Sequence, residues 1–122
     1  MKANISIYDP AGEYFFEEGC FINELSNSDA DPAVSIAQAR VAPGQKTRWH
    51  LLQGITERYV LLRGSGIVEV DGLEPRGVGP GDVVTIPPGA RQRISNPGAE
   101  DLVFLAVCTP RFTPQAYVDV QE

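Results

Sequence analysis

The only histidine of the chain, His50, lies seven residues before Glu57 in the stretch RWHLLQGITE. An imidazole and a carboxylate are two of the donor types that hold divalent metal ions in proteins. The same two groups can move a proton, because a histidine titrates near neutral pH and a carboxylate can hold its ring in place. The pair therefore indicates metal binding or acid–base chemistry, with His50 and Glu57 as the candidate catalytic residues.

Short segments of strand character surround this pair. They are rich in Val, Ile, Leu, Thr or aromatic residues, and turn sequences such as APG, RGSG, GPGD and NPGAE separate them. The segments are FINEL, VSIAQARV, TRWHLL, RYVLL, GIVEV, DVVTIP, RQRISN and LVFLAVCT. No window of about 12 residues or more keeps a helical stripe of apolar side chains. This pattern predicts an all-β sandwich or barrel.

The chain divides into three parts that differ in residue composition. Residues 1–33 are expected to supply a strand and a polar loop that pack on the barrel, and residues 34–109 the barrel itself. Residues 110–122 are expected to form a tail that covers the outside of the barrel or a partner. A chain of 122 residues is long enough for one hydrophobic core and one active site.

Composition narrows the class of protein. The net charge is −6 and the arginines are scattered along the chain, which argues against nucleic acid as a partner. No apolar run approaches the roughly 20 residues of a membrane span, and the first residues lack the character of a secretory signal. We therefore expect a cytoplasmic protein with no membrane partner. Cys20 and Cys108 lie in apolar segments and are interpreted as packed thiols rather than a disulfide or nucleophiles.

Two motifs with matching intervals resemble those of the cupin superfamily. The spacing of the first cupin motif, G-x5-H-x-H-x3,4-E-x6-G, is reproduced by Gly44, His50, Leu52, Glu57 and Gly64. The spacing of the second, G-x5-P-x-G-x2-H-x3-N, is reproduced by Gly81, Pro87, Gly89, Gln92 and Asn96. The resemblance covers roughly residues 34–109. It implies a double-stranded β-helix, or jelly-roll barrel, with a ligand cavity open at one end and usually with a homodimeric assembly.

Two positions of these motifs depart from the family pattern, and both belong to its metal ligands. The family holds a divalent metal with two histidines and the glutamate of the first motif and the histidine of the second. Here Leu52 stands at the second histidine position and Gln92 at the last. The resemblance therefore implies a reduced metal set of His50, Glu57 and Gln92. Such a set could hold Mn, Fe, Ni or Zn weakly.

Two metal-free alternatives stay open. In the first, His50, Glu57 and Gln92 hydrogen-bond one another inside the barrel, which then recognises a ligand or acts as a regulatory domain. Leu52 favours this alternative, because a leucine donates nothing to a metal. In the second, His50 and Glu57 are the acid and the base of a metal-free isomerase or lyase.

The alternation of side chains along strands adds candidate ligand-binding residues. It places Arg48 on the face of His50, Tyr59 on the face of Glu57, and Arg40 on the same face as Gln38. An arginine that projects into the cavity would favour an anionic or carboxylate-bearing small molecule. The predicted partner is thus a small molecule, and the predicted ligand-binding residues are Gln38, Arg40, Arg48, Tyr59 and Gln92.

Overall fold

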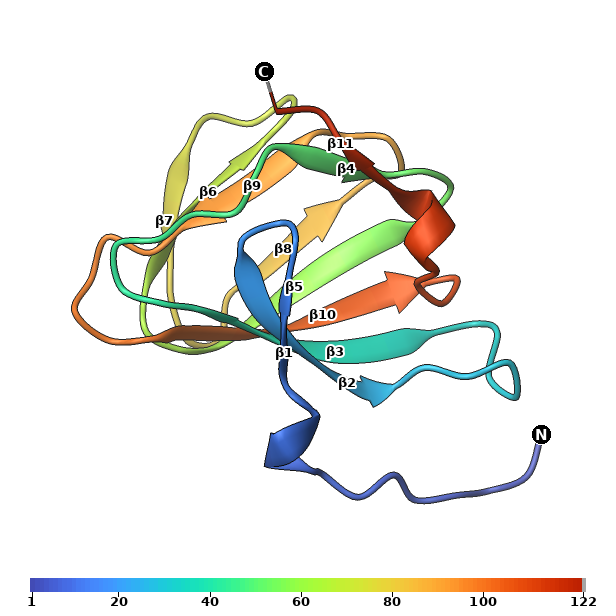
Figure 1. Cartoon of the computed structure of the whole chain (residues 1–122). Coiled ribbons are helices and arrows are strands. Elements are labelled where there is room, and N and C mark those ends of the chain that lie inside the picture. The colour runs from blue at the N-terminus through green and yellow to red at the C-terminus, as the bar shows by residue number, and fades with distance from the viewer. Residues whose placement is uncertain (122) are drawn as a thin grey trace.

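The computed structural model describes residues 1–121, and it consists of two antiparallel sheets that face each other (Figure 1). The six-stranded sheet has the order β1 (Tyr14–Phe16), β2 (Cys20–Ser26), β3 (Ser35–Val41), β10 (Leu102–Thr109), β5 (Thr56–Arg63) and β8 (Val83–Ile86). The five-stranded sheet has the order β11 (Tyr117–Asp119), β4 (His50–Leu52), β9 (Gln92–Ser95), β6 (Gly66–Val70) and β7 (Arg76–Val78).

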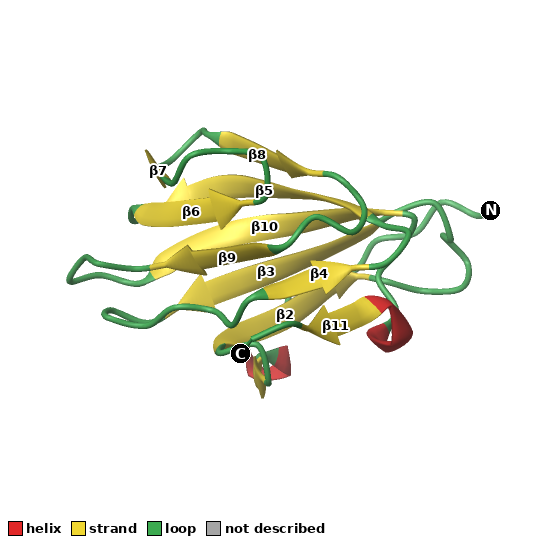
Figure 2. Cartoon of the chain, turned by 90° about the horizontal axis from the view of Figure 1, so that it is seen from above, coloured by secondary structure: helices red, strands yellow, loops and turns green. Residues whose placement is uncertain are grey.

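Helical structure among the described residues is confined to two short 3-10 turns, η1 (Pro10–Gly12) and η2 (Pro114–Ala116) (Figure 2). Each of the eight segments of strand character contains a strand. The all-β prediction and the double-stranded β-helix are therefore confirmed. Within residues 1–121, no helix is long and apolar enough to cross a membrane.

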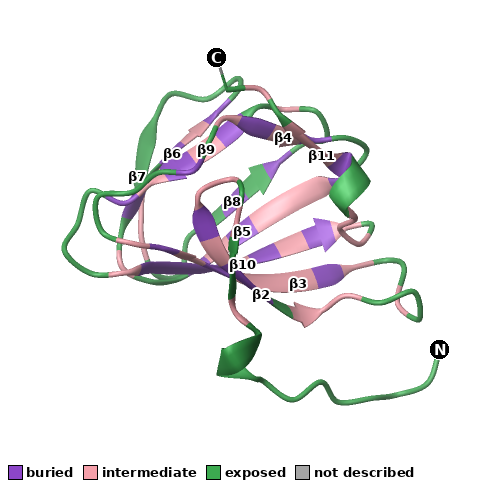
Figure 3. Ribbon diagram, viewed as in Figure 1, coloured by how far each residue is buried: buried purple, intermediate pink, exposed green. Residues whose placement is uncertain are grey.

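The hydrophobic core lies between the two sheets, and buried residues occur on the strands of both (Figure 3). Burial alternates along β5 and β10 because successive side chains of a strand point to opposite faces. The most deeply buried apolar side chains of this core are Val41, Leu61, Ile86, Ile94 and Leu102. The six-stranded sheet thus forms one wall of a packed barrel, and the five-stranded sheet forms the other.

The glycines and the asparagine of the two motifs shape the turns at the ends of the strands. Gly64 has a φ of +76°, and a Cβ atom there would lie 2.5 Å from the carbonyl oxygen of Asp101. Buried Asn96 donates from Nδ2 to the carbonyl oxygens of Val41 at 2.9 Å and Glu100 at 2.7 Å. These positions are structural, and they hold the ends of the strands in register.

Segments from outside the predicted barrel complete both sheets. Strand β2 pairs with β3, and β11 pairs with β4 through the partners Tyr117 and Leu52. The tail therefore covers its own barrel, which is one of the two placements expected for it. The segment before η1 has no assigned secondary structure and runs away from the sheets (Figure 1).

Candidate functional site

A cavity opens between the sheets near the η2 end of the barrel and takes its walls from both of them. Its empty space, including the solvent-filled mouth, is about 580 Å³. Its polar lining consists of Tyr14, Glu18, Glu24, Ser35, His50, Glu57, Tyr59, Cys108 and Tyr117. Aromatic and aliphatic side chains make up the rest of the wall, as expected for a site that takes a small organic molecule.

His50 begins strand β4, and its ring is held at both nitrogens. Nδ1 lies 2.6 Å from the carbonyl oxygen of Arg48, two residues earlier in the chain. A carbonyl oxygen only accepts hydrogen bonds, so Nδ1 carries a hydrogen and donates it. Nε2 lies 3.0 Å from Oε2 of Glu18. The orientation of the ring is therefore fixed by its own backbone on one side and by a carboxyl group on the other.

The contact between His50 and Glu18 needs one proton. Because Nδ1 is already protonated, Nε2 of a neutral ring has only a lone pair, and a carboxylate oxygen has only lone pairs as well. The proton belongs either to Nε2, which gives an imidazolium and a carboxylate, or to Glu18, which gives two neutral groups. Burial raises the pKa of Glu18 to about 7 and lowers the pKa of His50. The two groups thus share a proton near neutral pH.

Glu18 reaches the cavity from the turn between β1 and β2. The backbone N–H of Arg48 donates to the carbonyl oxygen of Glu18 at 2.7 Å, which ties this turn to the segment before β4. The turn closes through Gly19, which has a φ of +102°. The position of the Glu18 carboxyl group beside the imidazole is therefore held by a backbone hydrogen bond as well as by the contact between the two side chains.

Tyr117 stacks on one face of the His50 ring. The two rings are stacked with centroids 5.3 Å apart, and the edge of Phe16 packs on Tyr117 at 5.1 Å. Strand β11 brings Tyr117 there by pairing with β4. The stacking keeps water from one side of the imidazole, and His50 is only 2% exposed.

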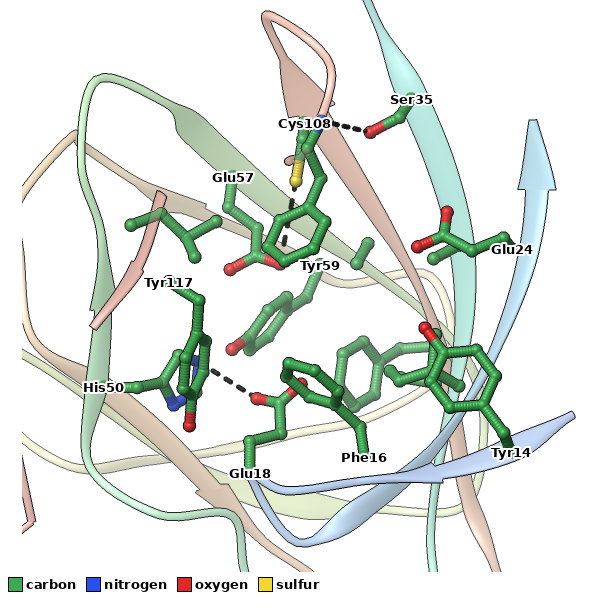
Figure 4. A pocket seen from close by; sticks show the side chains of 17 residues that line it. Tyr14, Phe16, Glu18, Glu24, Ser35, His50, Glu57, Tyr59, Cys108 and Tyr117 are labelled. Carbon is green, nitrogen blue, oxygen red and sulfur yellow. Dashed lines mark hydrogen bonds and ion pairs between the residues drawn. The ribbon is translucent and has the colours of Figure 1, made fainter. Parts of the chain in front are cut away.

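Glu57 projects from β5 into the same cavity, so that its carboxyl group and those around His50 face a common space (Figure 4). Its Oε2 accepts from the thiol of Cys108 at 3.9 Å, whereas the buried Oε1 has no hydrogen-bond partner among the described residues. Burial and the nearby charge of Glu18 raise the pKa of Glu57 to about 7, against smaller opposing effects of His50, Gln92 and Cys108. Glu57 thus has a free oxygen and changes charge near neutral pH.

Gln92 and Tyr59 form a second hydrogen-bonded pair next to His50 and Glu57. Gln92 is the cross-strand partner of His50 and is fully buried, and its Oε1 accepts from the hydroxyl of Tyr59. Its Nε2 has no partner among the described residues. Tyr59 lines the cavity on the same face as Glu57, as the alternation predicts. Its ring packs against Phe104 with centroids 4.4 Å apart.

These contacts do not fit a metal ion at His50, Glu57 and Gln92. Nε2 of His50 is taken by Glu18, and Oε1 of Gln92 is taken by Tyr59. Leu52, at the second histidine position, lines the cavity with an aliphatic side chain. Across residues 1–121, no group of three His, Cys, Asp or Glu side chains is arranged to hold an ion.

Two of the predicted ligand-binding residues lie outside the cavity. Gln38 and Arg40 do share one face of β3, but the cavity is lined from β3 by the opposite face, through Ser35, Ala37 and Ala39. Arg40 donates to Glu13 at 2.6 Å and lies 4.1 Å from the ring of Phe21. The structure therefore gives these two side chains no access to a ligand in the cavity.

Arg48 is a third misplaced candidate. Its side chain is 48% exposed and pairs with Asp119 at 2.6 Å. The expected alternation with His50 fails because β4 begins only at His50, so Arg48 is not part of the strand. The expectation that an arginine selects an anionic ligand loses its structural basis, since no Arg or Lys side chain lines the cavity.

Comparison with known proteins places the chain in a family. Residues 37–108 match the model of the cupin domain. The chain belongs to the cupin family. An uncharacterized protein of Methanocaldococcus jannaschii is 32% identical to this cupin over 115 residues, which cover 93% of this chain and 91% of the relative.

Several solved structures share the fold of this cupin. A predicted oxalate decarboxylase of Thermotoga maritima is 29% identical, with a TM-score of 0.68 over 75% of this chain and 80% of the other. A nucleoside dehydratase of Streptomyces is 18% identical, with a TM-score of 0.77 over 99% of this chain and 92% of the other. The latter likeness shows the fold alone.

Proposed function

We propose that this cupin is a metal-free acid–base catalyst, an isomerase or lyase, that acts on a small molecule bound in the barrel cavity. The observation that carries the proposal is the 3.0 Å contact between Nε2 of His50 and Oε2 of Glu18, which lies in the same cavity as the carboxyl oxygen of Glu57 that has no partner among the described residues. A proton donor and a proton acceptor that are tuned near neutral pH and held apart are what proton transfer at carbon requires.

In the proposed reaction, the carboxylate of Glu57 takes a proton from the carbon next to a substrate carbonyl group. The electrons of that C–H bond form a C=C bond, and the carbonyl oxygen takes the proton that Glu18 and His50 share. For an isomerisation, the carbon that lost its proton also carries a hydroxyl group: this hydroxyl gives its proton to the Glu18–His50 pair and becomes the new carbonyl, while Glu57 returns its proton to the former carbonyl carbon. For an elimination, Glu57 gives its proton to a departing β-hydroxyl group, which leaves as water, and the enol returns its proton to the Glu18–His50 pair. Glu18 is a positioning residue that supplies and recovers the proton of His50.

The Thermotoga maritima structure supports the lyase part of this proposal in a general way. It is described as a predicted oxalate decarboxylase, and decarboxylation breaks a carbon–carbon bond. The name does not identify the substrate of this chain.

Weak binding of Mn, Fe, Ni or Zn at His50, Glu57 and Gln92 is the rival proposal. The unpartnered Oε1 of Glu57 favours it, because a buried carboxylate oxygen without a hydrogen bond could serve a cation. Against it, two of the three donors are already engaged by Glu18 and Tyr59. A metal-free barrel that only binds or senses a ligand would keep the cavity and lack the proton transfer.

One experiment separates these functions. The protein, purified without a histidine tag, is incubated in D2O with dihydroxyacetone, pyruvate and aminoacetone, and exchange of the protons next to the carbonyl is followed by NMR. We expect exchange of at least one compound to be accelerated and unchanged by EDTA. Glu57→Gln should lose the acceleration by about 100-fold or more, as removal of a general base does, and exposed Glu100→Gln should retain it.

Two results would count against the proposal. Absence of exchange with all three compounds would leave only a binding function. Exchange that EDTA abolishes, together with stoichiometric metal in the purified protein, would favour the rival metal site.

A further inference from the structure

The ionisable side chains that line the cavity are mostly acidic. Three carboxyl groups line it: Glu18 and Glu57 inside, and Glu24 on β2 at the mouth. The only nitrogen base on the wall is His50, and the chain's Arg and Lys side chains lie elsewhere. With one proton shared by Glu18 and His50, the lining is neutral or negative near pH 7, and no arginine or lysine is there to neutralise a carboxylate ligand.

A second observation is independent of this charge. The Oε1 atom of Glu57 is buried, points into the cavity and has no hydrogen-bond partner among the described residues. Nε2 of the fully buried Gln92 has no partner either, although the Gln92 amide lies close enough to lower the pKa of Glu57. A buried polar atom without a partner is costly. The cavity therefore contains an acceptor oxygen that a donor in the cavity could satisfy.

Aromatic rings make up much of the remaining wall. The cavity is lined by Tyr14, Phe16, Tyr59, Phe104, Phe112 and Tyr117. Edge-to-face contacts hold Phe16 against Phe112 at 6.5 Å and against Tyr117 at 5.1 Å. The faces of such rings carry negative electrostatic potential, and they bind organic cations, above all alkylated ammonium groups.

We propose that the cavity binds an organic cation, an amine or quaternary ammonium compound with a small apolar body, whose charged group lies between the aromatic wall and the carboxyl group of Glu57. The inference rests on the proposed function, because it names the substrate class of the same acid–base site. It also replaces the anionic ligand that the arginines had suggested.

Proton linkage is a consequence of this placement. Burial keeps the carboxyl group of Glu57 partly protonated near pH 7, whereas a neighbouring cation favours its charged form. Binding should therefore release a proton, and affinity should rise with pH through about 7. The other titratable groups that face Glu57 are Glu18, His50, Tyr59 and Cys108. Of these, the proton shared by Glu18 and His50 also lies near the bound charge, and it would be released in part.

The test uses three compounds of nearly equal shape. Choline carries a quaternary ammonium group, 3,3-dimethylbutan-1-ol is its neutral carbon analogue, and 3,3-dimethylbutanoate is an anion. Binding to the intact protein is measured by calorimetry at about pH 6 and about pH 8, in buffers of different ionisation enthalpy. Tetramethylammonium and ethylammonium extend the cation series. We expect choline to bind at least about tenfold tighter than the alcohol, with proton release.

Substitutions of single carboxyl groups show which of them contributes to binding of the cation. Glu57→Gln should weaken choline binding by about tenfold or more and leave binding of the alcohol nearly unchanged, because only the cation uses the carboxylate. Glu24→Gln, at the mouth, should have a smaller effect in the same direction. Exposed Glu100→Gln is the matched control and should bind choline as the wild type does.

The inference is overturned if the alcohol or the anion binds as tightly as choline, or if none of the three cations binds at about 10 mM. These results are distinguishable from failure of the proposed function. A protein that prefers neutral compounds but still exchanges protons next to a carbonyl has the acid–base function without the cation preference. A protein that binds choline and exchanges no protons has the preference without the catalysis.

Discussion

Oε2 of Glu18 lies 3.0 Å from Nε2 of His50, on the side of the ring opposite the nitrogen that donates to the carbonyl oxygen of Arg48. The carbonyl fixes the hydrogen of Nδ1, and so the contact with Glu18 must contain a single shared proton. His50 and Glu18 therefore form a hydrogen-bonded pair that holds one proton. This contact also occupies the nitrogen that a metal would need.

Replacement of Glu57 by glutamine should change how stability depends on pH. The pKa of Glu57 is raised to about 7 from its ordinary value of 4.5, so between these values the folded protein holds a proton that the unfolded chain has lost. The free energy of unfolding should therefore fall as pH rises from about 4.5 to above 7, by up to about 3 kcal/mol for this group.

Glutamine does not titrate, so Glu57→Gln lacks this fall in the free energy of unfolding. The variant should therefore be more stable than the wild type at about pH 8, and the two stabilities should be closer at about pH 5. Urea unfolding at the two pH values measures the difference, and Glu100→Gln serves as the control. A variant that is destabilised equally at both pH values would show that the carboxyl group of Glu57 is not held protonated by burial.

Restoring the two missing histidines should create a metal site. Leu52→His combined with Gln92→His adds two imidazoles beside His50 and Glu57, and Gln92 is already the cross-strand partner of His50. We expect the double variant to bind Zn²⁺ or Ni²⁺ at one equivalent and to melt at a higher temperature with the metal than without it. The wild type should show no such shift. A double variant that binds no metal would mean that these positions do not converge as in metal-binding cupins.

Removal of the ring that covers His50 should cost stability. Tyr117 stacks on His50 and packs against Phe16, so Tyr117→Ala should lower the free energy of unfolding by about 2 kcal/mol. Tyr8→Ala is a suitable control, because Tyr8 is 56% exposed in the segment before η1. Equal stabilities of the two variants would show that β11 is not docked on the barrel.

The segment before η1 gives a prediction about assembly. Its Ile5 and Ile7 are 86% and 83% exposed, which is unfavourable for a chain that stays alone in water. We expect light scattering to show a dimer at micromolar concentration, and a monomer for the variant with Ile5→Ser and Ile7→Ser. Leu73→Ser, at another exposed leucine, should remain a dimer. A monomeric wild type would contradict the homodimer that the family resemblance implies.

The strands and the positions of the motif residues could be predicted from sequence because both depend on local chemistry. Turn glycines, apolar runs and fixed intervals are readable along the chain, and Gly44, Gly64, Gly81 and Gly89 all adopt positive φ. The alternation of side chains also paired Tyr59 with Glu57 correctly. It could not tell which face of β3 is inside, and so Gln38 and Arg40 were assigned to the cavity in error.

Glu18 and Tyr117 could not be found by this reasoning. Glu18 lies in a turn of the N-terminal segment, and Tyr117 lies in the C-terminal tail, outside the intervals of both motifs. Glu18 meets His50 because its turn contacts the backbone of Arg48, and Tyr117 does so because β11 pairs with β4, which is distant in sequence.

The proton between His50 and Glu18 is tested most directly by the nitrogen NMR spectrum of the only histidine in the chain. With ¹⁵N-labelled histidine, followed from about pH 5 to about pH 9, Nδ1 should stay protonated throughout. Nε2 should report the shared proton at low pH and a lone pair without a hydrogen bond at high pH. In Glu18→Gln the Nε2 signal should report a neutral ring to lower pH, because the partner charge is gone. A neutral ring in the wild type that carries its hydrogen on Nε2, with Nδ1 bare, would contradict the account.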